Sequence, residues 1–197
     1  MQSCGDLARR RLVARVGFVL ASWFGELLVE LDDERRAHSI AAGRRAESAL
    51  AALDAGLRSD VVVAATLHDI GYAHPWLDFH PLDGARFLAE QEFSETICHL
   101  VAHHSASTYE AEDRGISLVA YRDFAVSRND LGPAHAVVWW ADLTTGPQGQ
   151  LMTVEQRLDD IADRHGSDVV ARSAERIRPI LLAAGQSPVG SIQVRSG

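Results

Sequence analysis

Lysine is absent from this chain, and all 19 of its basic residues are arginines. No lysine amine can therefore act as a catalytic base or contact a phosphate, so cationic contacts must come from arginine, histidine or a bound cation. Cysteine is scarce as well, because Cys4 and Cys98 are the only two. Two thiols so far apart argue against a disulfide framework and a thiolate zinc site, and they favour the reducing cytoplasm as the location.

Positive charge and long apolar runs are also lacking. The formal net charge is −8, so the basic surface that a nucleic-acid polymer needs is missing. The apolar stretch GFVLASWF near the N-terminus is soon interrupted by Glu26 and Glu30. Its apolar residues recur every three or four positions, which indicates an amphipathic helix rather than a leader peptide or a membrane span. We expect neither nucleic acid nor membrane among the partners.

Length and periodicity favour one all-α domain. A chain of 197 residues with 47% apolar content can bury a single core, and no apolar–polar alternation is long enough for a sheet. We expect an N-terminal amphipathic helix within 1–33, a central domain over 34–147, further helices of the same domain over 148–185 and a flexible tail at 186–197. The predicted helices span 7–30, 34–54, 59–70, 81–91, 94–105, 114–129, 133–143, 153–165 and 167–184.

Histidine and aspartate are concentrated around the stretch TLHDIGYAHPWLDFH at 66–80. His68 and Asp69 end an apolar helix there, and both side chains could reach a pocket beyond its last turn. His38 lies on an alanine-rich helix whose small side chains let neighbouring helices approach closely, and Asp142 ends the apolar run VVWWAD. A carboxylate in such a run needs a cation or strong hydrogen-bond donors to offset its desolvation.

The segment ICHLVAHH ends in a histidine pair with two different orientations. His104 shares the apolar stripe of this segment and is expected to be buried, whereas His103 lies to the side at the edge of the pocket. His99 is expected to stack one turn below His103. A single histidine on an apolar helix is more often a hydrogen-bonded core residue than a metal ligand.

Several inward-facing histidines and carboxylates from separate helices favour metal binding over simple hydrogen bonding in the core. Burying them all without a cation would leave many polar atoms unsatisfied at once. The sequence therefore predicts a metal centre that includes His68, Asp69, His104 and Asp142.

The residues His38, His68-Asp69 and Asp142, in that order, resemble the HD superfamily of metal-dependent phosphohydrolases, named for its His-Asp pair. The resemblance covers residues 34–147.

Two further histidines, His80 in HPLDGARFL and His104 in VAHHS, resemble the subgroup that holds two metal ions. It includes the HD-GYP cyclic-dinucleotide phosphodiesterases and the symmetrical diadenosine-tetraphosphate hydrolases. Tyr72 stands where HD-GYP enzymes usually carry a lysine, and their GYP signature is absent. Both departures argue against hydrolysis of cyclic di-GMP.

The resemblance implies two divalent ions, drawn from iron, manganese, zinc or cobalt, with Asp69 as the bridging ligand. One ion would also be bound by His38, His68 and Asp142, and the other by His80 and His104. It further implies hydrolysis of a small anionic phosphorylated substrate, a nucleotide or another phosphoester, with Asp69, His68 and His103 as catalytic residues.

Candidate substrate contacts rest on spacing alone. Arg45 and Arg86 follow metal-ligand candidates by seven and six residues and could bind a second phosphate, although surface positions suit them equally. Thr145 lies in a loop that could present hydroxyls to the same anion or form a simple turn. His74 could line the rim, and His135 could touch substrate but not the metal that Asp142 binds.

Two other functions remain open. Mixed-valence di-iron oxygenases use nearly the same ligand set, and a nucleotide- or metal-sensing module without turnover is the third interpretation. Exposed apolar positions on helix 7–30 either form a homodimer face or cap the core.

Overall fold

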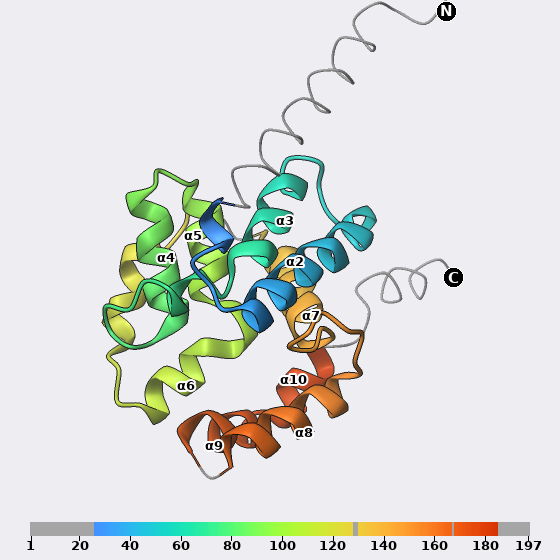
Figure 1. Ribbon diagram of the computed structural model, residues 1–197. Helices are drawn as coiled ribbons and strands as arrows, with labels where there is room; N and C mark the ends of the chain where they lie inside the picture. Colours follow the sequence, from blue (N-terminus) through green and yellow to red (C-terminus); the bar gives the residue numbers. More distant parts are fainter. Residues whose placement is uncertain (1–25, 128–129, 167, 185–197) are drawn as a thin grey trace, which may run out of the picture.

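The computed structural model describes residues 26–127, 130–166 and 168–184, and these form helices joined by loops (Figure 1). No strand occurs in these ranges, which confirms the prediction of an all-α fold. Among the same residues, no helix is both long and apolar enough to cross a membrane. The α-helices are α2 (Asp33–Ser48), α3 (Arg58–Leu67), α4 (His80–Glu90), α5 (Glu95–Ala102), α6 (Ser107–Asp113), α7 (Gly132–Leu143), α8 (Val154–His165), α9 (Val169–Arg176) and α10 (Arg178–Ala184). Short 3₁₀ helices are η1 (Leu50–Ala52), η2 (Ile70–Tyr72), η3 (His104–Ala106) and η4 (Leu118–Phe124).

One large apolar cluster, drawn from α2 to α7 and their connections, forms the main core. Helix α2 contributes Ala46 to this cluster, and Ala42 is also fully buried on the same helix. Gly43 permits the closest approach, because a Cβ atom added there would lie 2.1 Å from Oγ1 of Thr66 on α3. Alanine and glycine on α2 therefore bring its backbone against α3, and this contact sets the distance between His38 and the end of α3.

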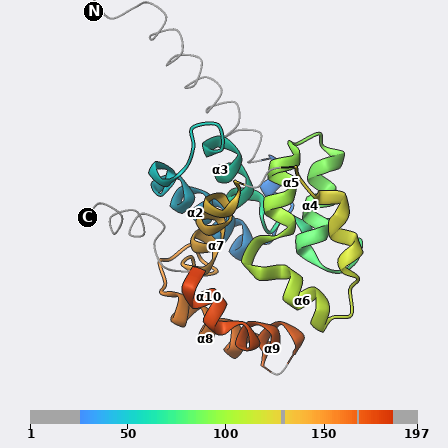
Figure 2. The same cartoon turned by 180° about the vertical axis from the view of Figure 1, so that it is seen from behind.

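A second, smaller apolar cluster attaches the C-terminal helices. It joins Ala106 and Leu143 of the main body to residues of α8, α9–α10 and their junction: Val154, Leu158, Ile177 and Leu181. Figures 1 and 2 show α8, α9 and α10 grouped together at one end of the molecule, beyond the end of α7. This arrangement places α8 close to α7 and η3, which carry two of the candidate metal ligands.

Three segments differ from the helices that the sequence predicts. A helix at 114–129 was expected, but α6 ends at Asp113, Gly115 adopts a positive φ of 72°, and a 3₁₀ helix capped by Ser117 follows. The expected helix 167–184 is divided at Ile177 into α9 and α10. Helix α6 itself was missed, because Ser105 and Ala106 turn the chain with left-handed φ values of 47° and 58° and neither is glycine. Most of the expected helix 7–30 lies outside the described residues.

Candidate metal centre

Side chains from α2, α3, α4, η3 and α7 meet at one place in the fold. His68 and Asp69 directly follow α3, His80 opens α4, and Asp142 lies in the last turn of α7. Helix ends project side chains past the last turn, so groups from separate helices can converge where those ends meet. The convergent residues are the six that were predicted to bind metal: His38, His68, Asp69, His80, His104 and Asp142.

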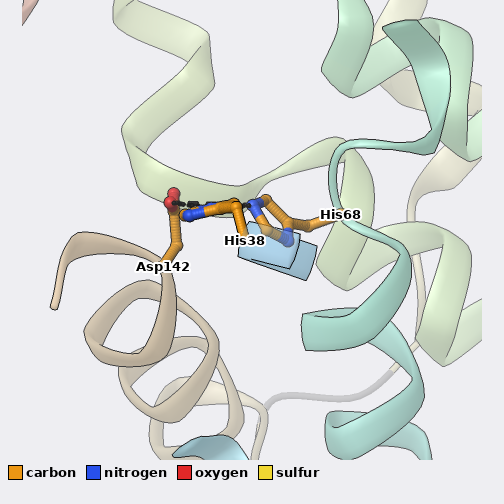
Figure 3. A group of neighbouring side chains, drawn as sticks. All are labelled: His38, His68 and Asp142. Carbon is orange, nitrogen blue, oxygen red and sulfur yellow. Dashed lines mark hydrogen bonds and ion pairs between the residues drawn. The ribbon is translucent and has the colours of Figure 1, made fainter. Parts of the chain in front are cut away.

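A first group consists of His38, His68 and Asp142 (Figure 3). Nε2 of His38 lies 3.1 Å from Nε2 of His68 and 3.2 Å from Oδ1 of Asp142. The third separation, from Nε2 of His68 to Oδ1 of Asp142, is 3.6 Å. Two nitrogen ligands about 2.0–2.1 Å from one ion at a tetrahedral angle lie about 3.4 Å apart. The three separations therefore match those of ligands that share one ion.

A second group extends from His68 to the other side of Asp69. The ligand atoms of His68, Asp69 and His104 all lie within 4.8 Å of one another. Oδ1 of Asp69 is 3.5 Å from Nε2 of His68 and also 3.5 Å from Nε2 of His80. Nε2 of His80 is 3.1 Å from Nε2 of His104. The carboxylate of Asp69 thus stands between two imidazole pairs.

The backbone fixes which nitrogen of each imidazole faces inward. Nδ1 contacts a carbonyl oxygen in three of them: Gly146 for His38 at 3.2 Å, Ala65 for His68 at 2.9 Å and Val101 for His104 at 2.6 Å. A carbonyl only accepts, so Nδ1 carries the proton and a neutral imidazole presents a lone pair at Nε2. If both rings were neutral, two such lone pairs would face each other between His38 and His68. This repulsive contact becomes favourable when a cation lies between them, which is how metal-binding histidines are oriented.

The electrostatics of the centre also favour a cation. Burial lowers the pKa of His68, but the carboxylates of Asp69 and Asp142 outweigh it and raise that pKa to about 9. Burial raises the pKa of Asp142, yet His68 and His38 together hold it well below its usual range. Without a metal the two carboxylates draw a proton onto His68, so a metal ion would displace that proton on binding.

The arrangement of the ligands matches the comparison with known families. Residues 35–167 match the HD domain family, and the matched segment contains all six convergent side chains. The chain belongs to the HD domain family. Membership places it in a superfamily of metal-dependent phosphohydrolases, and its histidine–aspartate groups are able to hold metal. A search of curated proteins found no match. A search of solved structures found none either.

In this HD domain, Asp83 and Gly71 fix the approach of His80. The buried carboxylate of Asp83 accepts hydrogen bonds from the backbone N–H groups of Leu77 and Phe79, at 2.8 and 2.9 Å, and so orders the loop before α4. Gly71 lies directly against α4, because a Cβ atom there would be 2.1 Å from the carbonyl oxygen of His80. Only glycine permits this contact, which holds His80 beside Asp69.

Arg35, Tyr72 and His80 form a stack at the mouth of the centre. The guanidinium of Arg35 lies 3.3 Å from the centroid of the Tyr72 ring, and that ring stacks on His80 at 4.2 Å. Nη1 of Arg35 is 3.8 Å from Oδ2 of Asp69. Burial, followed by the charge of Asp69, raises the pKa of the Tyr72 phenol well above its usual value, so Tyr72 is a neutral group.

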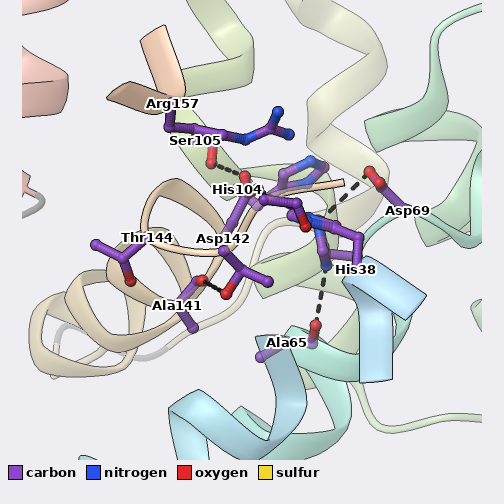
Figure 4. Close-up of polar contacts among 12 residues, drawn as sticks. His38, Ala65, Asp69, His104, Ser105, Ala141, Asp142, Thr144 and Arg157 are labelled. Atoms are coloured by element: carbon purple, nitrogen blue, oxygen red, sulfur yellow. Dashed lines mark hydrogen bonds and ion pairs between the residues drawn. The ribbon is translucent and has the colours of Figure 1, made fainter. Parts of the chain in front are cut away.

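Ser105 supports Asp142 from a strained part of the chain. Its hydroxyl donates a hydrogen bond to Oδ2 of Asp142, which leaves Oδ1 facing the histidines (Figure 4). Ser105 and Ala106 are both left-handed, a conformation that costs non-glycine residues about 1–3 kcal/mol each. The strained turn directs the hydroxyl at a predicted metal ligand.

A cavity of about 130 Å³ opens over the centre. Asp69, Asp142, His80 and His104 form its floor, and α8 contributes Arg157 on the opposite wall. Figure 4 shows Arg157 reaching from α8 toward His104 and Ser105. Nε of Arg157 is buried and has no hydrogen-bond partner among the residues that the structure describes, while its Nη1 binds Asp160 at 2.8 Å. Arg35 and Arg164 also line this cavity.

The proposed substrate contacts lie elsewhere in the fold. Arg45 packs over Trp140 and bonds the hydroxyl of Thr144, and Arg86 packs over Trp76 and pairs with Glu90. His74 stacks on Phe87 at 3.6 Å, and Thr145 is 1% exposed with its hydroxyl bonded to the carbonyl of Ala141. None of Arg45, Arg86, His74 and Thr145 lines the cavity over the centre.

His103 and His135 also stay outside that cavity. His99 lies next to His103 with ring centroids 4.4 Å apart, but the ring planes are tilted by 45° rather than stacked as the sequence predicts. His135 contacts His99 rather than the cavity.

The cavity arginines were not among the predicted site residues, although the sequence spacing of one of them is informative. Arg35 precedes His38 by three residues, and that spacing on a helix places both side chains on one face. Arg157 and Arg164 have no comparable signal. Their position depends on how α8 packs through the second apolar cluster, which no local pattern encodes.

Proposed function

We propose that this HD domain hydrolyses a small phosphoester, such as a nucleotide, in the cytoplasm, using two divalent ions. One observation carries the proposal: a single oxygen, Oδ1 of Asp69, lies 3.5 Å from histidine nitrogens on both of its sides. A carboxylate in that position suits a bridge between two ions. The donor set of imidazoles and carboxylates suits iron, manganese, zinc or cobalt.

The ligands divide between the two ions according to the geometry. His38, His68 and Asp142 would hold the first ion, His80 and His104 the second, and Asp69 would bind both. Two divalent ions, when bound, lower the pKa of a shared water and neutralise charge on a phosphoryl oxygen. His68 and Asp69 act through their hold on these ions.

Arginines of the cavity would bind the rest of the phosphate. Within the described part of the chain, Nε of Arg157 is a buried donor without a partner, and Arg157 lines the same cavity as the predicted metal ligands. Guanidinium groups bind phosphate through charge-assisted, forked hydrogen bonds. Arg35, already stacked on Tyr72 beside Asp69, would contact the same anion from the other side. These side chains supply the cationic contacts that a chain without lysine needs.

Turnover of a phosphoester panel, including nucleoside monophosphates and diadenosine polyphosphates, tests this proposal. Protein loaded with manganese, iron or cobalt should release phosphate or nucleotide product, and His68→Ala should not. Arg157→Ala should raise KM by about 10–100-fold, because one charge-assisted hydrogen bond contributes about 1.5–3 kcal/mol. Arg122→Ala, at an exposed position outside the cavity lining, is the matched control.

Failure of the panel would point to one of the other two functions. Oxygen consumption by the ferrous protein, with a mixed-valence EPR signal, would replace hydrolysis by oxygenase chemistry. Tight nucleotide binding with no product after hours would indicate a sensing module. Equal turnover by wild type and His68→Ala would show that the hydrolysis comes from a contaminant.

A further inference from the structure

A second group of imidazoles lies outside the metal centre and has no part in the proposed hydrolysis. His99 and His103 are one turn apart on and just after α5, and His135 approaches them from α7. The three ring centroids are separated by 4.4 Å, 5.0 Å and 6.2 Å. We refer to these three residues as the outer histidine cluster.

One contact in the outer histidine cluster repeats the geometry of the centre. Nε2 of His99 lies 3.1 Å from Nε2 of His135, the same separation as between His38 and His68. It also falls close to the distance of about 3.4 Å expected for two nitrogens on one tetrahedral ion.

The anchoring of His99 repeats that of the centre as well. Its Nδ1 lies 2.8 Å from the carbonyl oxygen of Phe124, so Nδ1 carries the proton and Nε2 presents a lone pair toward His135. His135 has no such anchor among the described residues, where its Nδ1 is buried without a partner.

The ligand types of the outer histidine cluster restrict what it can bind. Its close contacts are between imidazole nitrogens, which suit zinc, nickel and copper, whereas magnesium and calcium prefer oxygen ligands. Burial, followed by the neighbouring His99, lowers the pKa of His135 to about 4. The imidazole is therefore neutral at pH 7, and few protons compete with a metal for it.

We propose that the outer histidine cluster is a second, separate site for a divalent transition-metal ion, bound by Nε2 of His99 and Nε2 of His135. The ring of His103 lies beside the pair, tilted by 45° against His99 with centroids 4.4 Å apart. A bound ion would connect α5 to α7, the two helices that lead to His104 and Asp142.

Nickel titration of the protein, with its metal centre already loaded, tests this proposal by calorimetry. Wild type should take up one further Ni²⁺ and should not respond to Mg²⁺. His99→Gln and His135→Gln should each weaken this uptake at least about 10-fold, because loss of a ligand exceeds the effect of losing an outer hydrogen bond. His165→Ala is the matched control and should bind as wild type does, because His165 pairs with Asp168 on the C-terminal helices.

A measurement on the unaltered protein protects the test against variants that fail to fold. Imidazole ¹⁵N NMR should show the Nε2 signals of His99 and His135 moving together as one equivalent of Zn²⁺ is added. Unchanged signals, or the same nickel uptake in both glutamine variants, would overturn the proposal. The 3.1 Å contact would then be a hydrogen bond from Nε2–H of His135 to His99.

Discussion

The metal centre and the outer histidine cluster are built from the same imidazole pairs but differ in what surrounds them. Both contain Nε2 atoms 3.1 Å apart. The centre adds the buried carboxylates of Asp69 and Asp142 and anchors three imidazoles to backbone carbonyls. The outer cluster has one anchored imidazole, His99. Negative charge and fixed orientation, rather than the number of histidines, should therefore set how tightly each place holds a cation.

Removal of the Asp69 carboxylate should distinguish the metal centre from the outer histidine cluster most clearly. Asp69→Ala takes away the oxygen that lies between His68 and His80, so turnover should fall more than about 100-fold and the bound metal should decrease. Nickel uptake by the outer histidine cluster should be unaffected. Elemental analysis and steady-state assays would measure both effects.

The control for this variant is Asp54→Ala, at an exposed carboxylate outside both places. A full metal content in Asp69→Ala would show that Asp69 does not bridge.

Removal of bound metal should show that an ion in the metal centre stabilises the fold more than an ion in the outer histidine cluster. An ion present at 100 times its Kd stabilises the fold by about 2.7 kcal/mol, so stripping the centre with EDTA should lower Tm by about 5–10 °C. An ion near its Kd contributes about 0.4 kcal/mol, or about 1 °C, which is the effect we expect for nickel at the outer cluster.

Scanning calorimetry on metal-free and metal-reloaded protein would measure both changes in Tm. A Tm that stays constant while the ions are removed would separate the metals from folding altogether.

Substitution of Gly71 should displace His80 from the metal centre while leaving the outer histidine cluster intact. In Gly71→Ala the new Cβ meets the backbone of α4, including the nitrogen of Gly84 at 2.5 Å, so α4 must shift and carry His80 away from Asp69. Such overpacking costs about 1–3 kcal/mol. Denaturant unfolding and metal content would report the change.

Gly56→Ala is the matched control, because nothing lies within 4 Å of the added atom and its effect should stay within about 0.5 kcal/mol. Equal stability of the two variants would show that the close approach at Gly71 does not constrain α4.

The sequence predicts those features that depend on local pattern. The apolar stripe that places His104 inward is helical, and His104 is 3% exposed. The small residues of α2 predict a close helix contact, and Gly43 makes one against Thr66. The His-Asp pair at the end of α3 carries the family resemblance, which the match over 35–167 confirms.

Other features depend on contacts that no short segment contains. Arg157 reaches the cavity only because α8 packs through Leu158 on the second apolar cluster. The turn before α6 uses Ser105 and Ala106 in a conformation that sequences usually mark with glycine. Arg45 and Arg86 were predicted to contact substrate from their spacing alone. In the structure, their guanidinium groups pack over tryptophan rings.

Ser105 and Ala106 both have left-handed backbone conformations. At these two positions, the residue that would best stabilise the fold differs from the residue that would best support turnover. Glycine at either place would relieve about 1–3 kcal/mol of backbone cost and tend to raise the melting point. Glycine at 105 would remove the hydroxyl that orients Asp142, and glycine at 106 would loosen the turn that presents it. Selection for heat tolerance and selection for catalysis would therefore favour different residues here, and a survey of relatives from hot and temperate habitats should find variation concentrated at this turn.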